Sequence, residues 1–131
     1  MRGADDHHRG VRVLVAVDDS TLRENLPLLL GAAGEFELAF TDKGEVVACL
    51  ARDLKSEIVI LDPYAQGRNG LNMLRAVREQ LPKAVIVVLT IRSYREYREA
   101  CLAQGADFFL DKIGEFEKLA EILRFLQRRE S

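Results

Sequence analysis

Residues 58–70 read IVILDPYAQGRNG, and this stretch decides the fold. Its first four residues are all apolar, which is typical of a strand that is covered on both faces, as in a parallel sheet. Pro63 holds the residue before it in an extended conformation, so we expect Asp62 to close the strand. A carboxylate at that position either caps the next turn or takes part in chemistry. This stretch alone leaves both roles open.

The composition is that of one globular domain. The chain has 131 residues, 48% of them hydrophobic, which is enough for a single core. The 19 basic and 21 acidic residues give a net charge of -2, and no basic block occurs, so direct nucleic-acid binding is not expected. No apolar run is long enough to span a membrane, and the N-terminus has no signal-peptide core; we therefore expect a cytoplasmic protein without a membrane contact. Cys49 and Cys101 are too far apart for a metal knuckle and are expected to be reduced thiols.

The other segments alternate between strand and helix patterns. Strands are expected over 11–17, 35–40, 57–61, 84–89 and 107–110, and helices from Ser20 or Thr21 to Gly31, over 43–53, 71–80 and 93–104, and from Gly114 onward. Pro27 is expected to kink the first helix or to delay its start. Ser20 or Thr21 can cap that helix. Val46, Val47 and Leu50 should face inward from the second helix, and Gly105 should lie just beyond the end of the fourth. The alternation predicts an α/β fold with a parallel sheet, in which ligands bind beyond the carboxyl ends of the strands.

Four of the predicted strands end at polar residues. Asp18 and Asp19 follow the first, Asp62 the third, Thr90 the fourth and Lys112 the fifth. A parallel sheet places these ends on one rim, so three carboxylates, a hydroxyl and an ammonium are expected to gather there. Carboxylates that repel one another favour a divalent cation, and few oxygen ligands with room for water favour Mg²⁺. Together these groups suit a dianionic phosphoryl group, which one carboxylate can attack in line.

Each of these residues also has an ordinary interpretation. Asp18 or Asp19 can cap the helix that follows, although one cap requires only one carboxylate. Thr90 can be a strand-end hydroxyl, and Lys112 can be a solvated loop lysine. The ordinary interpretation requires all of them to meet on one rim by coincidence.

The sequence resembles a response-regulator receiver domain of the chemotaxis type, from Val11 to about Arg128. The residues that carry the resemblance are VDDS at 17–20, LD at 61–62 with Gly70 eight positions later, VLT at 88–90 and GADFFLDK at 105–112. The resemblance implies a flavodoxin-like, doubly wound sheet of five parallel strands in the order 2-1-3-4-5, with five helices. We expect the receiver domain over 11–128, between a flexible tail at 1–10 and a short tail at 129–131.

The resemblance also implies how the acidic residues act. Asp62 is similar to the aspartate that accepts a phosphoryl group from the phosphohistidine of a histidine kinase or of a histidine phosphotransfer protein. Asp18 and Asp19 resemble the acidic pair that holds Mg²⁺ together with that aspartate. The backbone carbonyl of Tyr64 would complete the protein ligands of the metal.

Further residues take roles by the same resemblance. Lys112 matches the lysine that pairs with the phosphoryl oxygens, Thr90 the switch hydroxyl, and Phe109 the aromatic residue that turns inward behind it. Tyr64 and Arg92 match the two positions that flank the acyl phosphate. Neither offers a carboxylate or a carboxamide to orient water, and both are large enough to shield the phosphoryl group. A comparatively long-lived phosphoryl-aspartate is therefore expected.

The chain departs from the receiver pattern at three positions. Gln66 stands where receivers usually carry a proline, and Ile91 is bulkier than the usual residue after the switch hydroxyl. Ile113 replaces the proline of a cis peptide, so we expect a trans bond after Lys112. These departures keep a second hypothesis open, a degenerate receiver that acts as a phosphorylation-independent interaction module. A magnesium-dependent phosphohydrolase ranks last, because no substrate pocket, acid–base histidine or phosphate-binding glycine loop is evident.

A partner-binding face is expected over the fourth helix, the fifth strand and the fifth helix. Tyr94, Arg95, Tyr97 and Arg98 lie on or near this face, where a downstream protein or a second copy in a homodimer could bind. The alternative is that they are ordinary solvated or half-buried helix residues. The chain ends soon after the last helix, so its output is expected to run through another protein, unless it is part of a longer regulator.

Overall fold

The computed structural model describes residues 10–17, 19–30, 36–64, 70–91 and 94–130. In this part of the chain five strands form one parallel sheet: β1 (Val11–Ala16), β2 (Phe36–Phe40), β3 (Ile58–Leu61), β4 (Val85–Thr90) and β5 (Phe108–Asp111). The helices are α2 (Ser20–Leu30), the short 3₁₀ helix η2 (Gly44–Val46), α3 (Val47–Asp53), α4 (Gly70–Gln80), α5 (Arg95–Ala103) and α6 (Phe116–Glu130). The strand order β2-β1-β3-β4-β5 confirms the predicted doubly wound fold.

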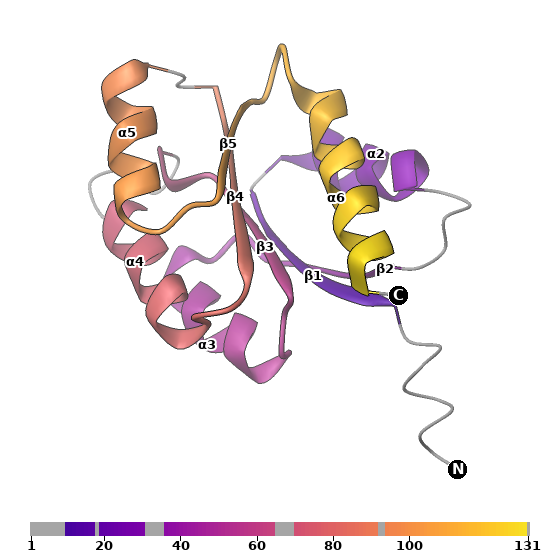
Figure 1. The fold of residues 1–131 in the computed structure, drawn as a ribbon, viewed down its shortest axis with the longest axis horizontal. Helices are drawn as coiled ribbons and strands as arrows, with labels where there is room; N and C mark the ends of the chain where they lie inside the picture. Colours follow the sequence, from indigo (N-terminus) through magenta and orange to yellow (C-terminus); the bar gives the residue numbers. More distant parts are fainter. Residues whose placement is uncertain (1–9, 18, 31–35, 65–69, 92–93, 131) are drawn as a thin grey trace.

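Helices cover both faces of the sheet. One hydrophobic core lies between the sheet and helices α2 and α6, and the other between the sheet and helices α3, α4 and α5 (Figure 1). The central strand β3 is buried at all four positions, as its unbroken apolar sequence predicts. Each such aliphatic side chain contributes roughly 1.5–3 kcal/mol when it leaves water. Within the described residues, no helix is both long enough and apolar enough to cross a membrane.

The strand register brings the carboxyl ends of four strands to one rim. Leu61, the last residue of β3, pairs with Ala16 of β1 on one side and with Val88 of β4 on the other. At the end of β4, Thr90 pairs with Asp111, the last residue of β5. The residues that follow these four strands therefore lie close together at the carboxyl edge of the sheet, and this edge is where the predicted site residues meet.

Helix α2 begins at Ser20 and continues past Pro27, so it does not start late, and the kink at Pro27 that was expected as the alternative stays a prediction. Two other details of the predicted helices are wrong. Val46 is 38% exposed and not inward-facing, because it ends η2 and α3 begins only at Val47, which is buried. Helix α5 begins at Arg95, two residues after the predicted start. The predicted end of the first helix at Gly31 lies outside the described residues.

The side chain of Arg78 in α4 forms hydrogen bonds both with the loop between α5 and β5 and with the residue just before β4. Gly105, which follows α5, has a φ of +118°, a conformation that favours glycine. Its carbonyl oxygen accepts hydrogen bonds from Arg78 Nη2 (2.8 Å) and Nε (3.1 Å). The same guanidinium donates to the carbonyl of Ala84 (2.8 Å) and pairs with Asp107 Oδ2 (2.7 Å). One side chain thus joins three segments that lie far apart in the sequence.

Arg78→Ala is expected to lower the free energy of unfolding by about 2–3 kcal/mol, since it leaves part-buried carbonyls without a charged donor. Urea unfolding followed by circular dichroism measures this change. Arg75→Ala is the matched control, because Arg75 is an exposed arginine of the same helix whose side chain bonds only to the nearby Asn72 among the contacts described. Equal stability of the two variants would show that the contacts of Arg78 contribute nothing specific.

Candidate functional site

Lys112 lies between two carboxylates that come from different strands. Its Nζ is 3.3 Å from Asp19 Oδ2 and 3.6 Å from Asp62 Oδ2. The backbone N–H of Lys112 donates to the carbonyl of Thr90 at 2.9 Å, which extends the pairing of β4 and β5 by one residue. The side chain of Lys112 therefore starts from a fixed point on the rim, and its charge meets both acids.

Asp19 has two functions in the structure. Its Oδ1 accepts the N–H groups of Thr21 (2.9 Å) and Leu22 (3.2 Å), so of the candidate caps that the sequence offers, Asp19 and not Ser20 or Thr21 caps α2. A carboxylate directly before the first helical residue reaches the free donors of the first turn, which explains the difference. Its Oδ2 faces Lys112. Burial raises the pKa of Asp19, but the hydrogen bonds from Leu22 and Lys112 outweigh it and hold the pKa below the ordinary value.

Asp62 is the most enclosed acid of the site. It is 5% exposed, and its Oδ1 is the one buried side-chain oxygen or nitrogen in the described part of the chain that has no hydrogen-bond partner. A buried carboxylate oxygen without a partner is costly and calls for an explanation. The backbone after it is tightly packed, because a Cβ at Gly70 would stand 1.9 Å from the carbonyl oxygen of Pro63. Asp62 thus has one oxygen toward Lys112 and one that can serve as a ligand or a nucleophile.

The two predicted switch residues lie inside the molecule. Thr90 is fully buried at the end of β4, and Phe109 of β5 is 6% exposed. Phe109 packs in the core that helices α3, α4 and α5 share with the sheet. The switch roles of both residues stay predictions.

An aromatic series connects the Asp62 loop to α5 and β5. The rings of Tyr64 and Tyr97 meet edge to face with centroids 6.1 Å apart, and those of Tyr97 and Phe109 do so at the same distance. The Arg98 guanidinium lies 5.9 Å from the centroid of the Phe109 ring. This series was not predicted from the sequence, because Tyr97 sits among charged residues and was expected only as part of a partner face or as a solvated or half-buried helix residue. In the structure Tyr97 is half-buried, whereas Tyr94, Arg95 and Arg98 of the predicted partner face are exposed.

Tyr97, the middle residue of this series, and its neighbour Cys101 are both neutral near pH 7. Burial raises the pKa of Tyr97, and its neighbour Cys101 and the charge of Asp62 raise it further. Burial also raises the pKa of Cys101 to about 11, since the opposing hydrogen bond with Tyr97 does not offset it and the charge of Asp62 adds to it. The Tyr97 hydroxyl and the Cys101 thiol therefore lie in the electrostatic field of Asp62 and carry no charge themselves near pH 7.

Other predicted site residues are placed only in part. Asp18, Gln66 and Arg92 lie outside the described residues. The bond between Lys112 and Ile113 is trans, as predicted, and Ile113 is 82% exposed. Behind it, Glu115 Oε1 accepts the N–H of Asp111 at 2.8 Å and Oε2 pairs with Lys118 at 3.0 Å, and these two bonds lower the pKa of Glu115.

The donor set fits a hard divalent cation. Asp19 and Asp62 present carboxylate oxygens on the same rim, and the free Oδ1 of Asp62 can join a metal without breaking an existing bond. Within the described residues, no three acidic, histidine or cysteine side chains are grouped closely enough to hold a metal ion. Of the three predicted acidic ligands, Asp19 and Asp62 lie on the same rim and Asp18 is outside the described residues, so the Mg²⁺ site stays a prediction.

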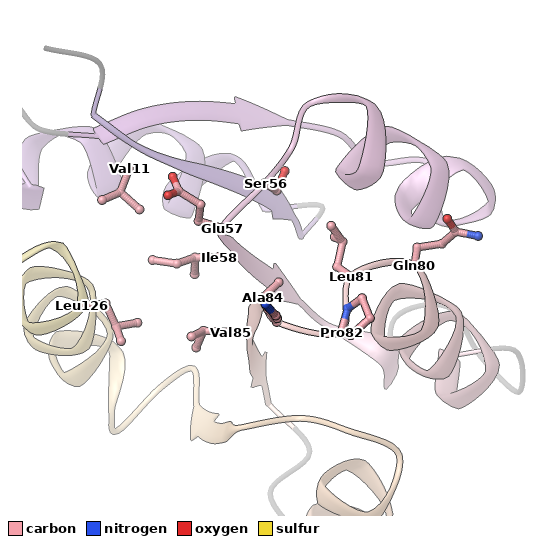
Figure 2. Close-up of a pocket in the computed structure, with 11 residues that line it drawn as sticks. Val11, Ser56, Glu57, Ile58, Gln80, Leu81, Pro82, Ala84, Val85 and Leu126 are labelled. Atoms are coloured by element: carbon pink, nitrogen blue, oxygen red, sulfur yellow. The ribbon is translucent and has the colours of Figure 1, made fainter. Parts of the chain in front are cut away.

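A pocket of about 460 Å³ lies at the opposite end of the sheet from Asp62. It is lined by Val11, Ile58 and Val85, the first residues of β1, β3 and β4, and by Leu126 of α6, which surround a common space in Figure 2. Asp62 follows the last residue of β3, so this pocket is separate from the carboxylate site. The chemistry of the rim does not use it.

The model of the response regulator receiver domain family matches residues 13–124. The chain belongs to this family. Over 121 residues this receiver domain is 31% identical to the two-component response regulator PhoP of Pseudomonas aeruginosa, a match that covers 92% of the chain and 53% of PhoP. It is 37% identical over 120 residues to the response regulator MprA of Mycolicibacterium vanbaalenii, covering 91% of the chain and 51% of MprA. The receiver domain thus spans about half the length of these relatives.

Solved response regulators share the fold of this receiver domain. A response regulator from Thermotoga maritima superposes with a TM-score of 0.78 at 19% identity, over 91% of this chain and 98% of the other. A response regulator protein from Burkholderia pseudomallei with a phosphorylated aspartic acid, a calcium ion and citrate superposes with a TM-score of 0.72 at 22% identity, over 92% and 72%. At these identities the likeness concerns the fold alone.

Proposed function

We propose that this receiver domain accepts a phosphoryl group on Asp62 from a histidine kinase or a histidine phosphotransfer protein. The observation that carries the proposal is the position of Lys112 Nζ between Asp19 and Asp62, next to a buried Asp62 oxygen without a hydrogen-bond partner. This arrangement supplies a nucleophilic carboxylate and a fixed cation for the oxygens of a transferred phosphoryl group. The phosphorylated receiver would then act on a partner through its α5, β5 and α6 face, in the cytoplasm.

The transfer would form one bond to phosphorus and break another. An oxygen of Asp62 attacks the phosphorus as the bond between phosphorus and the imidazole nitrogen of the donor breaks, and the electron pair of that bond stays on the nitrogen. Lys112 offsets the negative charge of the phosphoryl oxygens, and the buried Thr90 hydroxyl is the nearby donor at the end of β4. The acyl phosphate then remains on Asp62 until water attacks it.

Mg²⁺ is part of the proposal. Asp18, Asp19, Asp62 and the backbone carbonyl of Tyr64 would hold the ion. When bound, it would neutralise charge on the acids and on the phosphoryl oxygens. The chain would still provide the position of the nucleophile, through the tight packing of Pro63 against Gly70.

Intact mass measured after incubation with acetyl phosphate and Mg²⁺ tests this function. We expect the wild-type protein to gain the mass of one phosphoryl group, and to gain none when a chelator removes the metal. Asp62→Asn is the matched control, because the amide keeps the shape of the side chain and lacks the nucleophilic oxygen pair. Equal addition to Asp62→Asn would contradict the assignment of Asp62.

A wild-type protein that gains no mass under these conditions would favour the alternative, a degenerate receiver that binds a partner without phosphorylation. Two described departures from the receiver pattern keep this alternative in view: Ile91, which replaces the usual small residue and is 54% exposed, and Ile113, which replaces the usual proline and is 82% exposed. In that case Asp62→Asn should bind the partner as well as the wild type does.

A further inference from the structure

Tyr97 lies between Tyr64, which follows the proposed phosphoacceptor Asp62 by two residues, and the core that α3, α4 and α5 share with the sheet. Its ring contacts Tyr64, two positions after Asp62, and Phe109 of β5, at interplanar angles of 84° and 74°. Both are edge-to-face arrangements, which aromatic pairs prefer. Tyr97 is thus the central ring of three, and helix α5 holds it.

The contact matters because Tyr64 is 42% exposed. A half-exposed tyrosine can adopt several rotamers, and its ring shields a neighbouring group only while it stays in one of them. The edge of Tyr97 supports one side of that ring. Phe109 is buried and its ring also contacts Tyr97, so Tyr97 is packed between the Tyr64 ring and the core.

We propose that Tyr97 is a positioning residue that holds the Tyr64 ring beside Asp62 and so lengthens the lifetime of the phosphoryl-aspartate. The inference rests on the proposed phosphorylation of Asp62. In the hydrolysis that limits this lifetime, a water oxygen attacks the phosphorus and the bond from phosphorus to the Asp62 oxygen breaks. The electron pair returns to the carboxylate, the product is inorganic phosphate, and a proton passes to solvent. A ring held over the acyl phosphate restricts the approach of that water.

A purely structural role for Tyr97 is the competing explanation. It predicts a loss of stability that has no specific relation to Tyr64.

A double-mutant cycle on the lifetime separates the two explanations. Wild type, Tyr64→Ala, Tyr97→Ala and the double variant are phosphorylated with acetyl phosphate and Mg²⁺ and then freed of the donor. Loss of the phosphoryl group is followed by intact mass. We expect each single variant to shorten the half-life by roughly two- to tenfold, the range that the energy of one aromatic pair allows. The double variant should lose the group no faster than Tyr64→Ala does, because Tyr97 acts through Tyr64.

Two further variants make the test specific. Tyr97→Phe keeps the ring and should keep the wild-type half-life. Leu28→Ala removes an exposed apolar side chain of α2, on the other face of the sheet, and should leave the half-life unchanged. Circular dichroism checks the fold of every variant, and Tyr97→Leu, which keeps apolar volume without an aromatic edge, takes the place of Tyr97→Ala if the alanine variant does not fold.

The outcomes distinguish this inference from the proposed function. A wild-type protein that accepts no phosphoryl group overturns both. If the wild type is phosphorylated but Tyr97→Ala, or Tyr97→Leu in its place, keeps the wild-type half-life, only the role of Tyr97 is overturned. Effects of Tyr64→Ala and Tyr97→Ala that multiply in the double variant would also overturn it, since they would show two independent actions.

Discussion

Lys112→Met is expected to slow the phosphorylation of Asp62 by acetyl phosphate by about 10²- to 10³-fold, the usual loss when one preorganised charge donor is removed from a transition state. The lysine Nζ lies within 4 Å of both acids, at 3.3 Å and 3.6 Å, so it is in place before the phosphoryl group arrives. Methionine keeps most of the side-chain length and apolar volume but removes the charge. The rate of mass gain at saturating Mg²⁺ measures the effect.

The same variant should bind Mg²⁺ at least as tightly as the wild type, because a competing positive charge has left the two carboxylates. Loss of phosphorylation with retained metal binding therefore assigns Lys112 to the phosphoryl oxygens and not to the metal. Lys118→Met is the matched control, since Lys118 is exposed on α6 and pairs with Glu115. Lys112→Met and Lys118→Met that react at the same rate would contradict the role given to Lys112.

Gly70→Ala is expected to destabilise the protein by about 1–3 kcal/mol or more, the cost of forcing additional volume into a packed region. Gly70 is the first residue of α4, where helix propensity alone would make alanine favourable by up to about 1 kcal/mol. The added Cβ would stand 1.9 Å from the Pro63 carbonyl oxygen and 2.5 Å from its carbon, so the backbone directly after Asp62 would have to move. The steric term is the larger, and it reverses the sign.

Gly114→Ala is the natural comparison, because a Cβ at Gly114 meets no atom within 4 Å. Its free energy of unfolding should stay within about 0.5 kcal/mol of the wild type, as for most surface substitutions. Urea unfolding followed by circular dichroism measures both variants. Gly70→Ala should also react more slowly with acetyl phosphate, because the displaced segment positions the nucleophile. A Gly70→Ala variant as stable and as reactive as Gly114→Ala would show that the close approach is not required.

The sheet could be predicted from the sequence because its signals are local. The apolar run 58–61 ends at Asp62, which Pro63 holds in an extended conformation and so marks the end of the strand. The parallel order of the strands follows from their alternation with helices. The rim followed from the sheet, so the neighbourhood of Asp19, Asp62 and Lys112 was predictable before any distance was known. What the geometry adds is their separation and the oxygen of Asp62 that lacks a partner.

The features that the sequence did not reveal depend on contacts between distant segments. Tyr97 lies in a charged stretch, and only the fold shows that its ring turns toward Tyr64 and Phe109. The role of Arg78 is similarly hidden, since its acceptors lie up to 29 residues along the chain. Val46 was misplaced for a different reason. A single 3₁₀ turn before a helix rotates the following residues, and periodicity over so few positions does not detect it.

The two oxygens of Asp19 have separate tasks, and mutagenesis at this position therefore changes two properties at once. An alanine would remove the oxygen that faces the lysine and would also leave the first turn of α2 without its acceptor. A weaker metal affinity in such a variant could not be attributed to the missing ligand alone. Asparagine still caps a helix well but carries no charge, so it isolates the electrostatic contribution. Few residues can both cap α2 and present a negative charge to Lys112, so amino-acid replacement at this position should be slow.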